Sequence, residues 1–352
     1  MGFRYIGSKT KLINWLLKEI KASTPNGTNS TIIDLMSGTG AVAKALKKEG
    51  YSVIANDVMT YSYYHNYVNL LISDVPTFDN LNLDNEYDLF SKYASVIEFL
   101  NNLHPIKGYF YKEFSPKGQP SNGSSPRKYF TSEDAGRIDA IRSQLIEWYK
   151  EKKITDDEHA LLLNDLILAV NDVANIAGTY GHYLSKLSAH RTDLNLIPYS
   201  FEKDAYKKKH SVYRAYAEEI ASSLSGDICY IDPPYIKRQY AANYHVLETI
   251  AREDYPEAVG ASGLRPWRDQ YSDFCTKTKG LEAFAKIITS INCPIILISY
   301  SNEGLFPIET LVEHFNSFGK TSVYEKDYKR FKSHAEEEKE GVTEYLIRIE
   351  KN

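Results

Sequence analysis

The sequence has few cysteines, no long apolar run and little net charge. Its three cysteines show no metal-ligand spacing, so we expect neither a metal site nor a disulfide framework at Cys229, Cys275 and Cys293. Such cysteine usage fits a reducing cytoplasm. No apolar stretch reaches the roughly 20 residues of a membrane span, and the polar, basic start of the chain does not resemble a signal peptide. We therefore expect a cytoplasmic protein with no membrane partner.

The net charge of −4 does not indicate a nucleic-acid partner, and it does not exclude one, because such binding depends on a local basic face. The chain is rich in tyrosine, with 28 residues, and this side chain suits core packing as well as contact with bases and phosphates. A length of 352 residues allows one large domain or two.

The beginning of the chain predicts a doubly wound α/β sheet. Apolar residues at helical spacing favour a helix over 10–22, and a β-rich run follows at 31–36. A glycine turn, a second helix and a strand at 51–55 complete a β-α-β unit. Further strands are predicted at 228–231, 294–299 and 343–349.

The middle of the chain is helical and aromatic in pattern. Helices are predicted at 138–149 and 157–176, and residues 112–128 form a loop rich in proline, glycine and serine. We therefore expect a split α/β domain, with a mostly helical insertion between its two parts. The predicted boundaries are 1–66 and 205–352 for the α/β domain and 67–204 for the insertion.

Asp232-Pro-Pro-Tyr235 is the most informative motif, and it directly follows the apolar run 228–231. Each proline fixes its own φ and disfavours a helix at the residue before it, so the strand exits into a stiff loop. Open α/β sheets bind ligands at this carboxyl edge. Asp232 and the Pro233 carbonyl can accept both N–H bonds of an exocyclic amino group, while Tyr235 can stack on the base. An ordinary exit from a strand is the alternative interpretation.

A second motif, Asp34-Leu-Met-Ser-Gly-Thr-Gly40, lies between a predicted strand and a predicted helix. Gly38 and Gly40 let the backbone approach a ligand, and the helix N-terminus supplies N–H donors. Asp57 ends the next strand, about 20 residues on, where a carboxylate can bond ribose hydroxyls. The pair predicts a nucleoside cofactor. Ala43 stands where a dinucleotide fold prefers a third small residue, so an NAD enzyme remains open on this segment.

Taken together, the motifs resemble those of the DPPY-type, Dam-like (alpha-group) amino-group DNA methyltransferases. The segments that carry the resemblance are 4–12, 34–40, 56–57, 232–235 and 244–251. Their order is cofactor half, recognition insertion, catalytic half, as in that group. The resemblance implies a Rossmann-like methyltransferase sheet with an inserted DNA-recognition domain, and transfer from S-adenosylmethionine to the N6 amino group of adenine in duplex DNA. The chain departs from the family before the glycines, where Leu35, Met36 and Ser37 replace a frequent Phe or Pro.

The resemblance also implies roles for individual residues. The catalytic group would be Asp232, Pro233 and Tyr235. The cofactor would be held by Tyr5, Lys9, Asp34, Gly38, Gly40 and Asp57, with the Lys9 ammonium at the methionine carboxylate. Basic and aromatic side chains of the insertion can hold phosphates and read base edges, although each can also be part of a solvated face. These DNA-binding candidates are Arg127, Lys128, Tyr180, His182, Lys186 and Arg191.

Several other functions compete with adenine methylation. N4-cytosine methylation uses the same amino chemistry, but that branch more often has Ser before Pro-Pro, and RNA or protein-amide methyltransferases more often have Asn. A nicotinamide-dependent oxidoreductase has no evident use for the Asp232 motif, and a non-catalytic DNA-binding module needs neither motif. We expect a restriction–modification role, with a cognate restriction endonuclease as partner. A monomer is sufficient because bases are modified one at a time.

Overall fold

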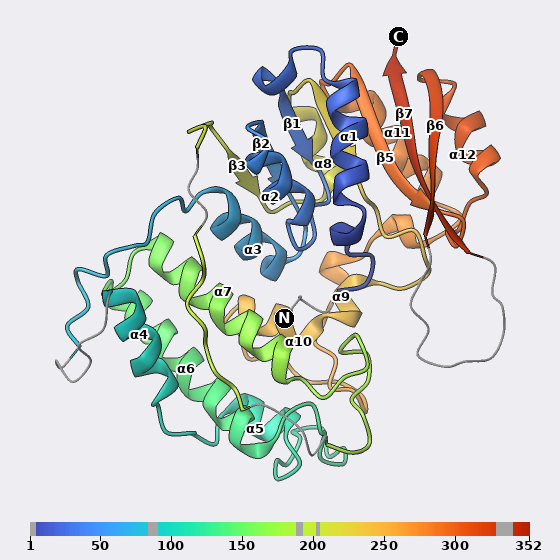
Figure 1. Ribbon diagram of the computed structural model, residues 1–352. Helices are drawn as coiled ribbons and strands as arrows, with labels where there is room; N and C mark the ends of the chain where they lie inside the picture. Colours follow the sequence, from blue (N-terminus) through green and yellow to red (C-terminus); the bar gives the residue numbers. More distant parts are fainter. Residues whose placement is uncertain (1–4, 84–90, 188–192, 202–204, 329–340) are drawn as a thin grey trace. The chain divides into compact units, whose positions relative to one another are not determined.

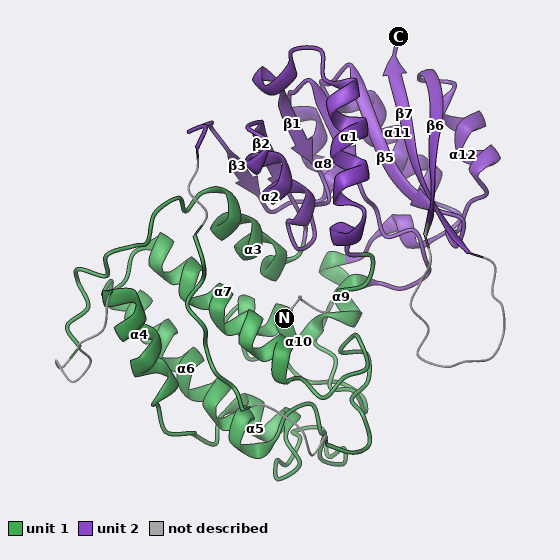
Figure 2. Cartoon of the chain, viewed as in Figure 1, with its two compact units in different colours: residues 1–7, 59–203, 240–270 green, residues 8–58, 204–239, 271–352 purple. Residues whose placement is uncertain are grey.

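The computed structural model describes residues 5–83, 91–187, 193–201, 205–328 and 341–352. The chain divides into two compact units, shown in Figure 2. Unit 1 comprises Met1–Gly7, Met59–Lys203 and Tyr240–Gln270. Unit 2 comprises Ser8–Val58, Asp204–Gln239 and Tyr271–Asn352.

The units differ from the predicted domains in three places, the first being Met1–Gly7, which was predicted in the α/β domain and belongs to unit 1. The predicted α/β domain extended to residue 66, but α3 (Thr60–Leu70) belongs to unit 1, where it packs against α7 (Asp156–Val173). The segment 240–270 was predicted in the α/β domain and also belongs to unit 1, because its helix α10 (His245–Ala251) packs on α3 and α7. The predicted end of the insertion at residue 204 is next to the observed boundary.

A seven-stranded mixed sheet forms the centre of unit 2 within the described residues, in the order β3-β2-β1-β4-β5-β7-β6. Neighbours from β3 to β5 are parallel, whereas β7 is antiparallel to both β5 and β6. The strands are β1 (Thr31–Asp34), β2 (Ser52–Asn56), β3 (Ser211–Tyr213), β4 (Ile228–Ile231), β5 (Ile295–Ser301), β6 (Gly319–Tyr328) and β7 (Val342–Lys351). The predicted α/β fold is confirmed.

Helices cover both faces of this sheet (Figure 1). One face carries α1 (Ile13–Ser23) and α2 (Ala41–Lys48), and the other carries α8 (Ala217–Ile220), α11 (Gly280–Ser290) and α12 (Ile308–Phe315). Because both faces are covered, the central strands are continuously apolar, and β4 is buried at every position. Buried residues of the hydrophobic core of unit 2 include Ile33, Cys229, Phe284, Ile287, Ile298 and Phe315. Short 3-10 turns are η1 (Lys9–Lys11), η2 (Gly27–Asn29), η3 (Ala221–Ser223) and η5 (Asp273–Cys275).

Unit 1 is built around α7, which is buried along most of its length. A capping box at Thr155 and Glu158 begins this helix, and its side chains Leu162, Leu166 and Val170 are fully buried. The other helices of unit 1 are α4 (Lys92–Asn101), α5 (Tyr109–Phe114), α6 (Ser132–Lys150), α9 (Tyr240–Asn243) and the 3-10 turn η4 (Arg268–Gln270). None of the helices in the described part of the chain has the length and apolar character of a membrane span.

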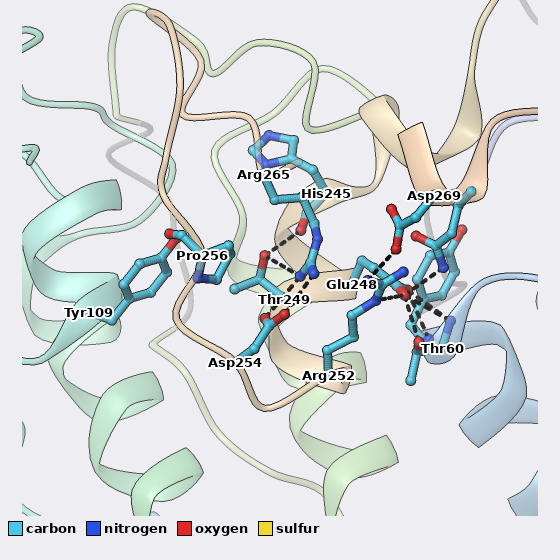
Figure 3. A network of polar contacts seen from close by, with 12 residues as sticks. Thr60, Tyr109, His245, Glu248, Thr249, Arg252, Asp254, Pro256, Arg265 and Asp269 are labelled. Carbon is cyan, nitrogen blue, oxygen red and sulfur yellow. Dashed lines mark hydrogen bonds and ion pairs between the residues drawn. The ribbon is translucent and has the colours of Figure 1, made fainter. Parts of the chain in front are cut away.

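A buried carboxylate fastens α10 to the start of α3 (Figure 3). The backbone N–H groups of Thr60 and Tyr61 donate to Oε2 of Glu248 at 2.9 and 3.3 Å. The side chains of Arg252 and Gln270 donate to Oε1 at 2.7 and 2.8 Å. A carboxylate here satisfies N–H groups that have no partner within the helix and opposes the positive end of the helix dipole. These bonds explain why the segment 240–270 is part of the helical unit.

Candidate active site

The carboxyl ends of β1 and β4 form the candidate site in unit 2. These strands are parallel neighbours, with Asp34 opposite Tyr230, so the turn after β1 and the loop after β4 leave from the same edge. The strand order reverses between them, since the chain proceeds outward through β2 on one side and β5 on the other. Open α/β sheets bind ligands at such a reversal.

The glycine turn after β1 requires its two glycines. Gly38 and Gly40 have φ of +52° and +73°, in the left-handed region that a side chain disfavours. Gly40 precedes α2, and its N–H donates to the Ser37 carbonyl at 2.8 Å. The N–H of Gly38 donates to Oδ2 of Asp57 at 2.8 Å. The structure therefore brings together the predicted glycines and the predicted acidic residue after β2.

Asn56 is a structural residue of the site whose role the sequence did not indicate. Its side-chain Nδ2 donates to the carbonyls of Leu35 and Ala215 at 3.0 and 3.1 Å, and its Oδ1 accepts from the Ala215 N–H at 3.1 Å. Its own carbonyl accepts from the N–H of Ser37 at 2.9 Å. Asn56 thus holds the ends of β1 and β2 against the segment after β3. An amide at the end of a buried strand is the signal that could have revealed it.

Asp34, Asp57 and Asp232 place acidic side chains at this edge. Asp34 is buried, and burial raises the pKa of its carboxyl well above the ordinary range, with further contributions from the charges of Asp232 and Asp57. S-adenosylmethionine carries a positive sulfonium, a positive ammonium and two ribose hydroxyls. An acidic edge beside a glycine turn suits all of these groups, so the residues present fit the expected cofactor.

Lys9 pairs with Asp232, the first residue of the loop 232–235. Its ammonium Nζ lies 3.1 Å from Oδ1 of Asp232 and 3.4 Å from Oε2 of Glu344, with only 4% of the side chain exposed. The same nitrogen lies 5.2 Å from the centre of the Tyr235 ring. Burial by itself would lower the pKa of Lys9, but the charges of Asp232 and Glu344 and the Tyr235 hydroxyl raise it above its ordinary value. Lys9 is therefore a charged member of the site.

The loop 232–235 is held in place by contacts with Tyr300 and Leu305. The Tyr235 carbonyl accepts from the N–H of Leu305 at 2.8 Å, and the Tyr235 and Tyr300 rings are 5.4 Å apart. Pro233 is buried. Burial raises the pKa of Asp232, Lys9 lowers it and the charge of Glu344 raises it, and together these effects leave the pKa at about 6. Asp232 is therefore mainly ionised at neutral pH.

Tyr5 does not belong to the same unit as the other cofactor candidates, which are all in unit 2. It belongs to unit 1, where its ring stacks on Tyr244 with centroids 4.8 Å apart. The Tyr244 hydroxyl accepts from the N–H of Ile6 at 2.7 Å, and the Tyr240 hydroxyl donates to the Ile6 carbonyl at 2.9 Å. Two tyrosines thus hold both polar backbone groups of the residue after Tyr5.

Arg127 and Tyr180 differ from the expectation of exposed DNA contacts, because both are fully buried in unit 1. The Arg127 guanidinium pairs with Glu113 at 2.8 Å and donates to the Gly260 carbonyl at 2.9 Å. The Tyr180 hydroxyl donates to Asn171 at 3.3 Å. In these positions both side chains hold protein segments together rather than face a ligand.

The remaining DNA-binding candidates lie nearer the surface. Lys128 is half-buried, and its ammonium donates to the Ser185 carbonyl at 3.0 Å. His182 is exposed, and its Nδ1 lies 3.2 Å from the Ser262 hydroxyl. Lys186 is exposed in the same turn. Arg191 lies outside the described residues.

Comparison with known proteins gives a consistent result. The profile of a family described as D12 class N6 adenine-specific DNA methyltransferase matches residues 5–313. Type II methyltransferase M.NlaIII of Neisseria lactamica is 34% identical, over 99% of this chain and 99% of that protein. Type II methyltransferase M.FokI of Planomicrobium okeanokoites is 36% identical over 99% of this chain, which spans 53% of that protein. Type II methyltransferase M.CviAII of Paramecium bursaria Chlorella virus 1 is 32% identical, over 97% of both.

Proposed function

Because the chain belongs to the family of D12 class N6 adenine-specific DNA methyltransferases, we propose that it methylates one adenine within a specific duplex sequence and serves as the modification enzyme of a restriction–modification system. S-adenosylmethionine is its methyl donor. The names of its relatives, which are type II methyltransferases, support the modification role. A restriction endonuclease that cuts the same unmethylated sequence is the proposed system partner.

One observation carries the assignment of the catalytic site. The Asp232 loop and the glycine turn leave adjacent strands at the point where the strand order reverses, and Asp57 is bonded to that turn at 2.8 Å. A carboxylate for an amino group and a cradle for a nucleoside cofactor thus lie at one edge of one sheet. Methylation of an amino group needs both the carboxylate and the cofactor cradle, whereas a nicotinamide enzyme would have no use for the carboxylate.

We assign Asp232 and the Pro233 carbonyl to the N6 amino group. When each accepts one N–H bond, the amino nitrogen becomes more tetrahedral and its lone pair less delocalised into the ring. Tyr235 would stack on the adenine after the base leaves the duplex, a step that costs a few kcal/mol. When bound, S-adenosylmethionine supplies an electrophilic methyl group on a sulfonium. The chain orients the nucleophile and stabilises charge, and no covalent enzyme intermediate is needed.

The cofactor is proposed to contact Gly38, Gly40, Asp34 and Asp57, with Asp57 at the ribose hydroxyls. Lys9 is proposed to use an N–H donor for the methionine carboxylate while its other donors serve the protein carboxylates. An ammonium has three donors, so these contacts are compatible. Tyr5 keeps its proposed role as an aromatic contact of the cofactor.

The proposed DNA contacts are limited to the surface candidates of unit 1. Lys128, His182 and Lys186 come from segments joined by the bond between Lys128 and the Ser185 carbonyl. They present positive charge and an imidazole, which suit phosphates and base edges. Arg191 remains a sequence-based candidate, whereas Arg127 and Tyr180 are proposed to support this surface from inside. The enzyme is proposed to act as a monomer in the cytoplasm, where one protein can modify one base at a time.

The deciding experiment uses duplex DNA that carries no methylated bases. After incubation with the protein and S-adenosylmethionine, nucleoside mass spectrometry should detect N6-methyladenine, and sequencing should find it at one recurring site. Asp232→Ala should abolish transfer while calorimetry still detects cofactor binding. N4-methylcytosine as the product would contradict adenine as the target, and retained turnover in Asp232→Ala would contradict the proposed role of Asp232.

A further inference from the structure

Glu344 lies in the candidate site although it is beyond residues 5–313, which match the family profile. It is near the start of β7, opposite Ser301 of β5 and Lys326 of β6. Its side chain is only 10% exposed, and Oε2 lies 3.4 Å from the ammonium of Lys9. A largely buried carboxylate is costly unless it is paired, so this position requires an explanation.

We propose that Glu344 is a positioning residue that shares the Lys9 ammonium with Asp232 and so keeps a net negative charge beside the target amino group, a role that rests on the proposed function of Asp232. The geometry supports shared pairing, because Lys9 lies 3.1 Å from Asp232 and 3.4 Å from Glu344. Lys9 has three N–H donors and can serve both carboxylates at once.

The charge balance explains the benefit of this arrangement. A pair of Lys9 and Asp232 alone is neutral, whereas the group of three that includes Glu344 carries one negative charge. As the N6–methyl bond forms and the sulfur–methyl bond breaks, positive charge develops on N6 before its proton is released to solvent. A net negative charge in a water-poor site stabilises that developing charge in advance.

Glu344 also prevents Lys9 from using all of the hydrogen-bonding capacity of Asp232. Asp232 must turn part of its hydrogen-bonding capacity from the ammonium to the adenine amino group. With Glu344 present, Lys9 keeps a second partner during this exchange and does not become an unpaired buried cation. Without Glu344, Lys9 would pair more tightly with Asp232, which would then be a poorer acceptor.

The charges around Asp232 fix the direction of the expected pH effect. Lys9 contacts it directly, the charge of Glu344, the other side-chain partner of Lys9, acts on it, Asp34 interacts with it from the end of β1, and the Tyr230 phenol lies before it on β4. The negative charge of Glu344 contributes to raising the pKa of Asp232, after the larger effect of burial. Removing that charge therefore lowers the pKa of Asp232.

The test is Glu344→Gln in the full chain, measured by single-turnover methylation of a duplex across pH with saturating S-adenosylmethionine. We expect the plateau rate to fall by about tenfold, a modest effect for one electrostatic contact. The low-pH limb of the rate profile should move to lower pH, and cofactor affinity by calorimetry should stay within about twofold. Glu344→Asp, which keeps the charge, should retain the wild-type position of the limb.

Glu350→Gln is the matched control, because it makes the same change on the same strand at a side chain that is 44% exposed. It should leave rate and pH profile unchanged. An unchanged rate in Glu344→Gln, or a slower rate with an unmoved low-pH limb, would overturn the proposal. If Glu344→Gln folds poorly, it will also lose cofactor binding. In that case the rate and pH profile of Glu344→Asp test the proposal. If instead Asp232→Ala retains turnover, the proposed function fails, independently of the result at Glu344.

Discussion

The backbone N–H of Gly38 donates to Oδ2 of Asp57 at 2.8 Å, which ties the glycine turn after β1 to the end of β2. One carboxylate therefore shapes the turn and is also the proposed ligand of the cofactor ribose. Loss of this side chain affects both contacts at once. A buried hydrogen bond to a charged group contributes about 1.5–3 kcal/mol.

We accordingly predict that Asp57→Ala lowers the affinity for S-adenosylmethionine by about 10- to 100-fold. Isothermal titration calorimetry measures this directly. Asp57→Asn keeps an oxygen that can accept from Gly38 and should lose less affinity. Unchanged affinity in Asp57→Ala would remove this residue from the cofactor site.

The rate of methyl transfer should depend on the ionisation of Asp232. Its pKa is raised to about 6, chiefly by burial, and the carboxyl accepts hydrogen bonds without donating one only while it is ionised. The single-turnover rate should therefore be constant above neutral pH and fall as the pH drops through about 6. A profile that stays flat down to pH 5 would indicate that Asp232 does not need to be ionised.

Arg127 should be required for stability rather than for phosphate binding. Arg127→Met leaves Glu113 as an unpaired buried carboxylate, which typically costs about 3–5 kcal/mol of folding free energy. Denaturant unfolding should show this loss, and adding Glu113→Gln should recover part of it. A stable Arg127→Met protein with weaker salt dependence of DNA binding would instead restore the phosphate contact predicted from the sequence.

Lys186 tests the proposed DNA-binding surface. Its side chain is exposed, so Lys186→Ala should leave unfolding unchanged. If it contacts a phosphate, the slope of log affinity against log salt concentration should decrease in magnitude by about 0.9. Lys18→Ala is a suitable control, because Lys18 is 81% exposed on α1 of unit 2. Equal salt slopes for the Lys186 variant and this control would exclude the contact.

Much of the sheet could be predicted because its strands have strong local signals. The run at 228–231 is apolar throughout and ends in two prolines, and the structure has β4 at Ile228–Ile231. The predicted strand at 294–299 corresponds to β5 at Ile295–Ser301. By contrast, β6 was not predicted, because this edge strand includes Lys320, Glu325 and Lys326, which interrupt the apolar pattern of a buried strand.

The site could be predicted only as far as its motifs extend. Asp232 lies in a short, specific motif, the glycine turn gains weight only together with Asp57, and the pairing of Lys9 with Asp232 agrees with placing both in one site. Glu344 has no local motif, and 335 positions separate it from its partner Lys9. Likewise, nothing near Arg127 in the sequence indicates that Glu113 and the Gly260 carbonyl enclose it. Such contacts depend on long-range packing.

The reversed direction of β7 has a practical consequence for handling the protein. Because β7 is antiparallel to β5, its beginning reaches the edge that holds the loop 232–235, whereas Glu350 pairs with Ile295 at the opposite edge. The N–H of Lys351 donates to the Pro294 carbonyl, which precedes β5. A fluorophore, affinity tag or fused protein attached after Asn352 therefore leaves from the side of the sheet away from the proposed catalytic loop, and labelling there should leave turnover intact.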